Sequence, residues 1–131
     1  MNSQKLFLIV AAVGLTPIAL SYGLAPSSSL EYLFQIPAVD TNSLHIFRAI
    51  MGLYLAMVVF WLIGAFKPHM TQAAIYSLVV FMLGLAAGRI LSLVLDGQPS
   101  ALLIVYLLLE LGFGIIGMML LREKYYCIYS A

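Results

Sequence analysis

The sequence GLAAGRILSLVLDGQPSALLIVYLLLE, residues 84–110, places an arginine and a glutamate inside two apolar stretches joined by a short connection. A charged side chain at bilayer depth costs about 2.5 kcal/mol or more, so neither Arg89 nor Glu110 is expected to face lipid alone. The connection, DGQPS, is brief enough to force the two stretches to run antiparallel as neighbours. We therefore predict that Arg89 and Glu110 point toward each other inside a helical membrane protein.

The composition of the 131-residue chain points to the membrane. Hydrophobic residues make up 64% of the sequence and charged residues only 8%, which is too apolar for a soluble domain and too short a chain for two domains. The net charge of +1 is far from the basic balance of a nucleic-acid-binding protein, so nucleic acid is excluded as a partner. We predict a single membrane domain over residues 1–131.

Four apolar stretches approach the roughly 20 residues that an α-helix needs to cross the hydrocarbon core. They are residues 6–24, 44–66, 73–95 and 101–121. The long connection between the first two stretches carries Ser28 and Glu31 at capping-box spacing and has an apolar side, which predicts a short interfacial helix. The expected fold is all-α: an integral membrane four-helix antiparallel bundle with a short interfacial helix in the first extracytoplasmic loop.

The cations outside the predicted spans all fall on one side of the membrane. They are Lys5, Lys67, Arg122 and Lys124. The loops on the opposite side carry acidic residues and no cation outside the spans. Because basic residues accumulate in cytoplasmic loops, we predict that both termini and the 67–72 loop are cytoplasmic.

The charges within the spans are expected at similar depths. Counted at 1.5 Å per residue from the non-cytoplasmic ends of their helices, Arg48, Arg89 and Glu110 lie about 8, 10 and 14 Å deep. Helical spacing places four further polar side chains on the same faces. These are His45, Ser92, Asp96 and Tyr106. We predict that the seven residues form one polar cluster, with a formal charge of zero, that opens outward.

The role of this cluster stays open between three alternatives. If Glu110 pairs with one arginine and Asp96 with the other, the cluster is saturated and only fixes the register of the helices. If Asp96 lies in water at the turn, one arginine is left to bind an anionic head group, a carboxylate or a phosphate. The third alternative is a proton relay through Glu110, Tyr106 and His45.

Four glycines are candidates for close helix packing. Gly84 and Gly88 have GxxxG spacing in the third span, and Gly114 and Gly117 lie beyond Glu110 on its face of the fourth span. This pattern predicts tight packing of spans three and four. The GxxxG pair would serve contacts between subunits equally well.

Catalytic and metal-binding motifs are missing from the sequence. His45 and His69 fall on opposite sides of the predicted membrane, and the sequence contains one cysteine and no HExxH motif. We therefore predict no catalytic residue, no metal ligand and no cofactor.

The segments LTPIALSYGLAP (15–26), HIFRAIMGLYL (45–55) and GRILSLVLDGQP (88–99), together with Glu110, resemble a bacterial family of small four-span membrane proteins known as a domain of unknown function. The resemblance covers nearly the whole chain up to Arg122. It implies a location in the bacterial inner membrane and a polar signature consisting of His45, Arg48, Arg89, Asp96 and Glu110. The resemblance implies no particular activity, because none is established for the family. The four-span layout also looks like that of quinone-linked small membrane proteins of the DoxX type, an analogy of architecture only.

Three functions are compatible with these features. The preferred one is a non-enzymatic accessory or oligomerising subunit whose charged cluster fixes the bundle and binds a lipid head group or small anion. Its partners would be membrane lipids and either copies of itself or a larger membrane complex. The alternatives are an oligomeric small-molecule or proton-coupled transporter and a quinone-linked membrane redox component.

Overall fold

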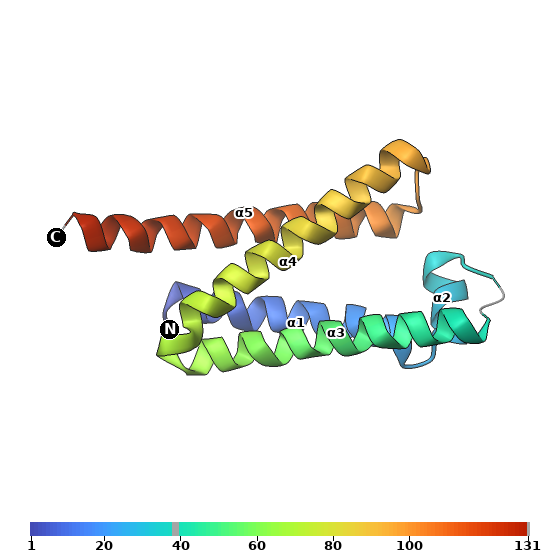
Figure 1. The fold of residues 1–131 in the computed structure, drawn as a ribbon, viewed down its shortest axis with the longest axis horizontal. Helices are drawn as coiled ribbons and strands as arrows, with labels where there is room; N and C mark the ends of the chain where they lie inside the picture. Colours follow the sequence, from blue (N-terminus) through green and yellow to red (C-terminus); the bar gives the residue numbers. More distant parts are fainter. Residues whose placement is uncertain (38–39, 131) are drawn as a thin grey trace.

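The computed structural model describes residues 1–37 and 40–130, which form five helices (Figure 1). The helices are α1 (Ser3–Gly23), α2 (Pro26–Phe34), α3 (Thr41–Phe66), α4 (Pro68–Leu95) and α5 (Ala101–Tyr129). The described residues contain no strand, which confirms the all-α prediction. All helices except α2 are long and apolar enough to cross a membrane. The chain is therefore a multi-pass membrane protein.

The long helices extend beyond the apolar stretches that predicted them. α5 has 29 residues and is about 43 Å long, whereas a hydrocarbon core is about 30 Å thick. Its last two turns, from Arg122 onward, carry the helix past the apolar segment. At its N-terminus, α3 starts before its apolar stretch because the Asp40 side chain accepts a hydrogen bond from the Ser43 N–H at 2.9 Å. This N-cap also lowers the pKa of Asp40.

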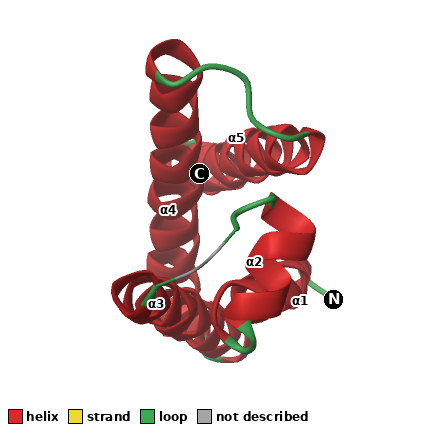
Figure 2. Cartoon of the chain, turned by 90° about the vertical axis from the view of Figure 1, so that its right-hand side faces the viewer, coloured by secondary structure: helices red, strands yellow, loops and turns green. Residues whose placement is uncertain are grey.

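The helices pack as two antiparallel pairs. α1 lies along α3, and α5 lies along α4, while α3 and α4 join the two pairs. α1 and α5 make few contacts, and the view along the bundle shows α5 standing apart from α1 (Figure 2). Both termini and the turn at Lys67 lie at one end, here called the terminal end; α2 and the turn at Gly97 lie at the other, the loop end (Figure 1). The bundle is thus closed along three seams and open along the fourth.

α2 begins two residues before the predicted capping box. Its first residue is Pro26, and the N-cap residue Ala25 makes no side-chain hydrogen bond, so Ser28 and Glu31 do not cap the helix. Proline is favoured at this position because its fixed φ suits a helix and its missing N–H would be unpaired there. Leu30 is fully buried, so α2 packs onto the loop end of the bundle.

Two of the four predicted packing glycines hold α5 against α4. A Cβ atom on Gly114 would lie 2.5 Å from Leu83 Cδ2, and one on Gly117 would lie 2.5 Å from Val79 Cγ2. The prediction is wrong for Gly84 and Gly88, which are exposed and have no atom within 4 Å of a Cβ position. A helix turns 100° per residue, so these two lie on a different face of α4 from the buried residues.

A close contact missed from the sequence lies at the turn between α3 and α4. A Cβ atom on Gly64 would collide with the side chain of Ala74. The Thr71 hydroxyl donates a hydrogen bond to the Gly64 carbonyl at 2.7 Å. Nearby, the fully buried Trp61 donates from its indole nitrogen to Ser77 Oγ at 3.2 Å. The terminal end of the bundle is therefore tightly packed.

We predict that Gly64→Val destabilises the protein by about 1–3 kcal/mol or more, because the added atoms force α3 and α4 apart. Thermal unfolding in detergent, followed through the fluorescence of the single Trp61, measures the effect. Gly52→Val is the matched control, since Gly52 also lies in α3 but has open space around its Cβ position. An equal Tm for the two variants would contradict this packing.

Candidate functional site

The structure brings Arg89 and Glu110 together between α4 and α5. The Arg89 Nε–H donates to both carboxylate oxygens of Glu110 at 2.9 Å. The Arg89 side chain is 21% exposed and the Glu110 side chain 9%. This is the one salt bridge between the described residues. The short turn at Gly97 places the two helices side by side, and the contacts at Gly114 and Gly117 bring them close enough for the pair to form.

The Arg89 guanidinium also lies beside two aromatic side chains. The guanidinium carbon lies 5.7 Å from the centre of the Tyr106 ring, which is within the range of a cation–π contact. Tyr22 also approaches the guanidinium from α1. Arg89 is thus surrounded by aromatic side chains and one carboxylate.

These aromatic side chains come from four different helices. Tyr22 of α1 stacks on Phe34 of α2, with ring centres 5.2 Å apart. Tyr54 of α3 meets the same Tyr22 edge to face at 5.6 Å, and Phe34 meets Tyr106 of α5 at 6.3 Å. The cluster therefore ties α2 and both helix pairs together at the loop end.

Three members of this site were not predicted from the sequence: Tyr22, Phe34 and Tyr54. One signal was available, because Tyr54 lies ten residues inside a predicted span, away from the interfaces where tyrosines usually gather. A phenol at that depth normally needs a polar neighbour. Tyr22 and Phe34 gave no comparable signal, since they lie at the ends of their helices.

The prediction that Arg48 and His45 join the cluster is wrong. Both side chains are exposed, and neither forms a salt bridge or hydrogen bond with a described residue. The inward face of α3 is set by its buried residues, which include Tyr54, Val58 and Trp61. Seven residues make about two helical turns, so Phe47 shares the face of Tyr54, and Arg48 is rotated about 100° away from it.

The prediction that Asp96 joins the cluster is also wrong, and Ser92 lines a hollow with Arg89 but makes no hydrogen bond to the ion pair. Both are exposed at the end of α4, where the Ser92 hydroxyl donates to Asp96 Oδ2 at 2.7 Å. Asp96 therefore neutralises neither arginine. Of the seven predicted residues, the structure gathers Arg89, Glu110 and Tyr106, and a relay that includes His45 has no path through the described contacts.

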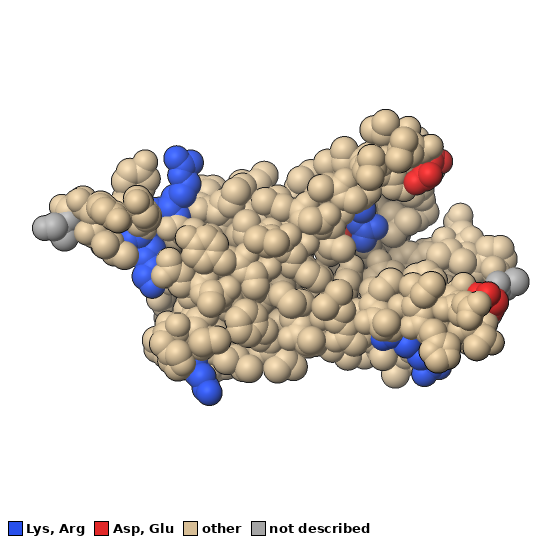
Figure 3. Space-filling view, in the orientation of Figure 1, with Lys and Arg blue, Asp and Glu red and all other residues tan. Residues whose placement is uncertain are grey.

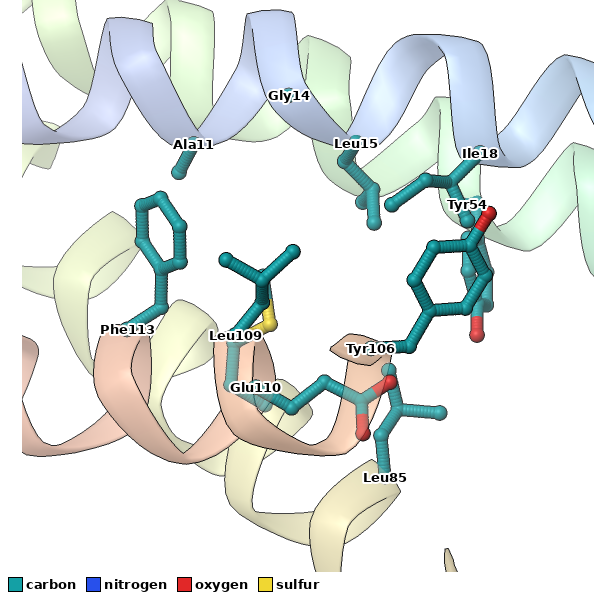
Figure 4. A pocket seen from close by; sticks show the side chains of 11 residues that line it. Ala11, Gly14, Leu15, Ile18, Tyr54, Leu85, Tyr106, Leu109, Glu110 and Phe113 are labelled. Carbon is teal, nitrogen blue, oxygen red and sulfur yellow. The ribbon is translucent and has the colours of Figure 1, made fainter. Parts of the chain in front are cut away.

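A cleft runs between α1 and α5 next to this group (Figure 4). It contains about 480 Å³ of space, including its opening, and apolar side chains form most of its walls. Its lining residues are Ala11, Gly14, Leu15, Ile18, Tyr54, Met82, Leu85, Tyr106, Leu109, Glu110 and Phe113. Figure 4 shows the Glu110 carboxylate and the Tyr54 and Tyr106 hydroxyls at one end and the Phe113 ring at the other. The cleft therefore has a polar end and an apolar end.

The charged side chains outside this site lie toward the two ends of the bundle. Figure 3 shows basic side chains at both ends of the bundle, whereas the acidic side chains visible in it lie at the loop end. No group of three or more His, Cys, Asp or Glu side chains within residues 1–37 and 40–130 is placed to hold a metal ion.

The family described as Domain of unknown function (DUF4345) matches residues 3–121. The chain belongs to this family. This confirms the resemblance seen in the sequence, and the DUF4345 match ends where α5 leaves its apolar segment. Neither a curated protein nor a solved structure matches the chain. The role of the DUF4345 site must therefore be argued from its geometry.

We predict that Arg89→Ala lowers stability by about 3–5 kcal/mol, because it leaves the Glu110 carboxylate buried without a partner. The double variant Arg89→Ala, Glu110→Ala should be more stable than this single variant, since no unpaired charge remains. Thermal unfolding in detergent compares the two. Arg48→Ala, which removes an exposed arginine without a described partner, is the control and should change Tm little. A double variant no more stable than the single one would show that the pair is not coupled.

Proposed function

We propose that this DUF4345 protein is a non-enzymatic membrane protein that binds a small amphipathic molecule of the bilayer between α1 and α5. The observation that carries the proposal is the cleft, which is apolar along its length and polar at one end. Ligand pockets commonly combine apolar walls with a few polar groups that orient the ligand. The cleft fits this description.

The boundaries of the cleft support entry from the side. Toward the terminal end, α1 and α5 meet through the rings of Phe7 and Phe113, whose centres are 5.7 Å apart. Toward the loop end, Phe34 of α2 packs against Tyr106. Between these two contacts the seam is open, and its rim residues Gly14 and Leu109 are exposed. A ligand would therefore enter from the bilayer with its chain along the seam.

An accessory or oligomerising role is part of the proposal. Gly84 and Gly88 leave a GxxxG face of α4 exposed, and such faces allow the backbones of two membrane helices to approach closely. This face lies outside the contacts between α4 and α5. It therefore remains available for a second membrane subunit.

We further propose a bacterial inner-membrane location with both termini in the cytoplasm. The supporting observation is that the cations outside the spans, Lys5, Lys67, Arg122 and Lys124, belong to the terminal end, and Figure 3 shows basic side chains there. The positive-inside rule assigns such an end to the cytoplasmic side. The site around Glu110 then lies in the outer half of the membrane.

This orientation predicts the labelling of the single, exposed Cys127. In intact spheroplasts, a membrane-impermeant maleimide should label Cys127 only after the membrane is permeabilised. The control is the variant Cys127→Ser, Ser28→Cys, whose thiol on α2 should react without permeabilisation. Labelling of Cys127 in sealed spheroplasts would contradict the orientation.

Filling the cleft should remove its ligand. We predict that Gly14→Phe places a ring in the open seam and lowers the amount of copurifying amphiphile at least about tenfold, as measured by native mass spectrometry and lipid extraction. Gly52→Phe is the matched control, because this exposed glycine in α3 also has open space but lies outside the cleft. Equal amounts of bound amphiphile in both variants would overturn the proposed function.

A further inference from the structure

The two members of the buried ion pair face different spaces. Glu110 lines the cleft between α1 and α5, and Arg89 is absent from its lining. Arg89 instead lines a separate hollow on the other side of the pair, together with Ser92, Leu103 and other residues of α4 and α5. A ligand in the cleft therefore meets the carboxylate of the pair and not the guanidinium.

The carboxylate retains hydrogen-bonding capacity toward the cleft. A carboxylate has about four lone-pair sites, and here a single N–H of Arg89 is shared between its two oxygens. Glu110 accepts no other hydrogen bond from the described residues. Its free lone pairs require a donor, because an ionised carboxylate can only accept. The carboxylate thus favours a ligand that carries an O–H or N–H group.

Two hydroxyl groups lie at the same end of the cleft as this carboxylate. Tyr54 and Tyr106 project into the polar end of the cleft, and neither hydroxyl forms a hydrogen bond within the described part of the chain (Figure 4). A phenol both donates and accepts. A ligand oxygen could accept a hydrogen bond from one tyrosine while its own proton is donated to Glu110. A hydroxyl group satisfies both requirements at once.

The charge of the site excludes an ionised head group on physical grounds. Arg89 and Glu110 sum to zero, so an added charge in this apolar cleft would have no counter-ion left to pair with. An anion would also lie against the Glu110 carboxylate rather than the guanidinium, because Arg89 does not line the cleft. An uncharged head group avoids both costs.

We propose that the cleft selects an uncharged amphiphile with a hydroxyl group at its polar end, which donates to Glu110 and accepts from Tyr54 or Tyr106. This inference rests on the proposed function and names the class of its ligand. Long-chain alcohols, acylglycerols, isoprenoid alcohols and hydroquinones all carry this chemistry. These molecules differ in the shape of the apolar chain and in whether the hydroxyl group is carried on a ring. The shape of the cleft walls would select among them.

A series of ligands with one common chain tests the proposal on the wild-type protein. Native mass spectrometry would measure the binding of 1-hexadecanol, its methyl ether, hexadecyl phosphate and hexadecylamine. The alcohol should bind at least about fivefold more tightly than the ether, because the ether cannot donate a hydrogen bond. It should also bind more tightly than both ionised ligands. Equal or tighter binding of the ether, the phosphate or the amine would overturn the proposal.

The same measurement with natural types of ligand identifies which class of hydroxyl-bearing molecule the cleft binds. A monoacylglycerol, a short polyprenol and a hydroquinone with an isoprenoid tail would each be compared with its methyl ether. The hydroxyl form should bind more tightly in whichever pair binds the protein best. Preference for the ether form in that pair would count against the proposal.

Variants connect this preference to the named residues. Tyr54→Phe removes one donor to the ligand oxygen and should weaken binding of the alcohol severalfold and binding of the ether as well, because both oxygens accept this hydrogen bond. Tyr76→Phe, outside the cleft, should leave the binding of both ligands unchanged. If Gly14→Phe fails to block every amphiphile, the proposed function itself is wrong. If Gly14→Phe blocks binding but wild type shows no preference for a hydroxyl group, only the ligand class is wrong.

Discussion

A carboxylate inside hydrocarbon needs a counter-charge from its own protein, and this requirement organises the structure. Glu110 lies in the middle of the apolar segment of α5, residues 101–121, and Arg89 on the neighbouring helix supplies an N–H to both of its oxygens at 2.9 Å. The contact depends on close approach of α4 and α5. Gly114 and Gly117 allow that approach because Leu83 and Val79 occupy the space where their side chains would be. Small residues and a buried charge pair therefore act together.

The other cations of the chain avoid hydrocarbon in a different way. Arg48 is seven residues into α3, about 10 Å from its first residue, and its side chain is exposed. A long side chain at this depth can reach the interface with its charged end. At the terminal end, Lys5 lies over the ring of Phe66, with its nitrogen 4.6 Å from the ring centre. Only Arg89 is held by a carboxylate within the described chain, which distinguishes it from these surface cations.

The open seam between α1 and α5 gives the site access to the bilayer. Three seams of the bundle are filled by side chains, whereas the fourth is bridged only at its two ends. α2 provides the bridge at the loop end, because Leu30 and Phe34 are buried against the rest of the protein. The polar end of the cleft is thus covered from above and reached from the side. This geometry matches a ligand that resides in the membrane.

The sequence by itself determined the class of fold and the partnership of Arg89 with Glu110. Both follow from the cost of polar groups in hydrocarbon, which acts on each helix and each charge locally. The sequence could not determine which residues join that pair, because helical rotation depends on the packing of all the helices. A rotation of about 100° separates Arg48 from the inward face of α3. The same orientation of the helix turns Tyr54 toward the site. The cleft was decided by tertiary structure alone, since it exists only where α1 and α5 fail to meet.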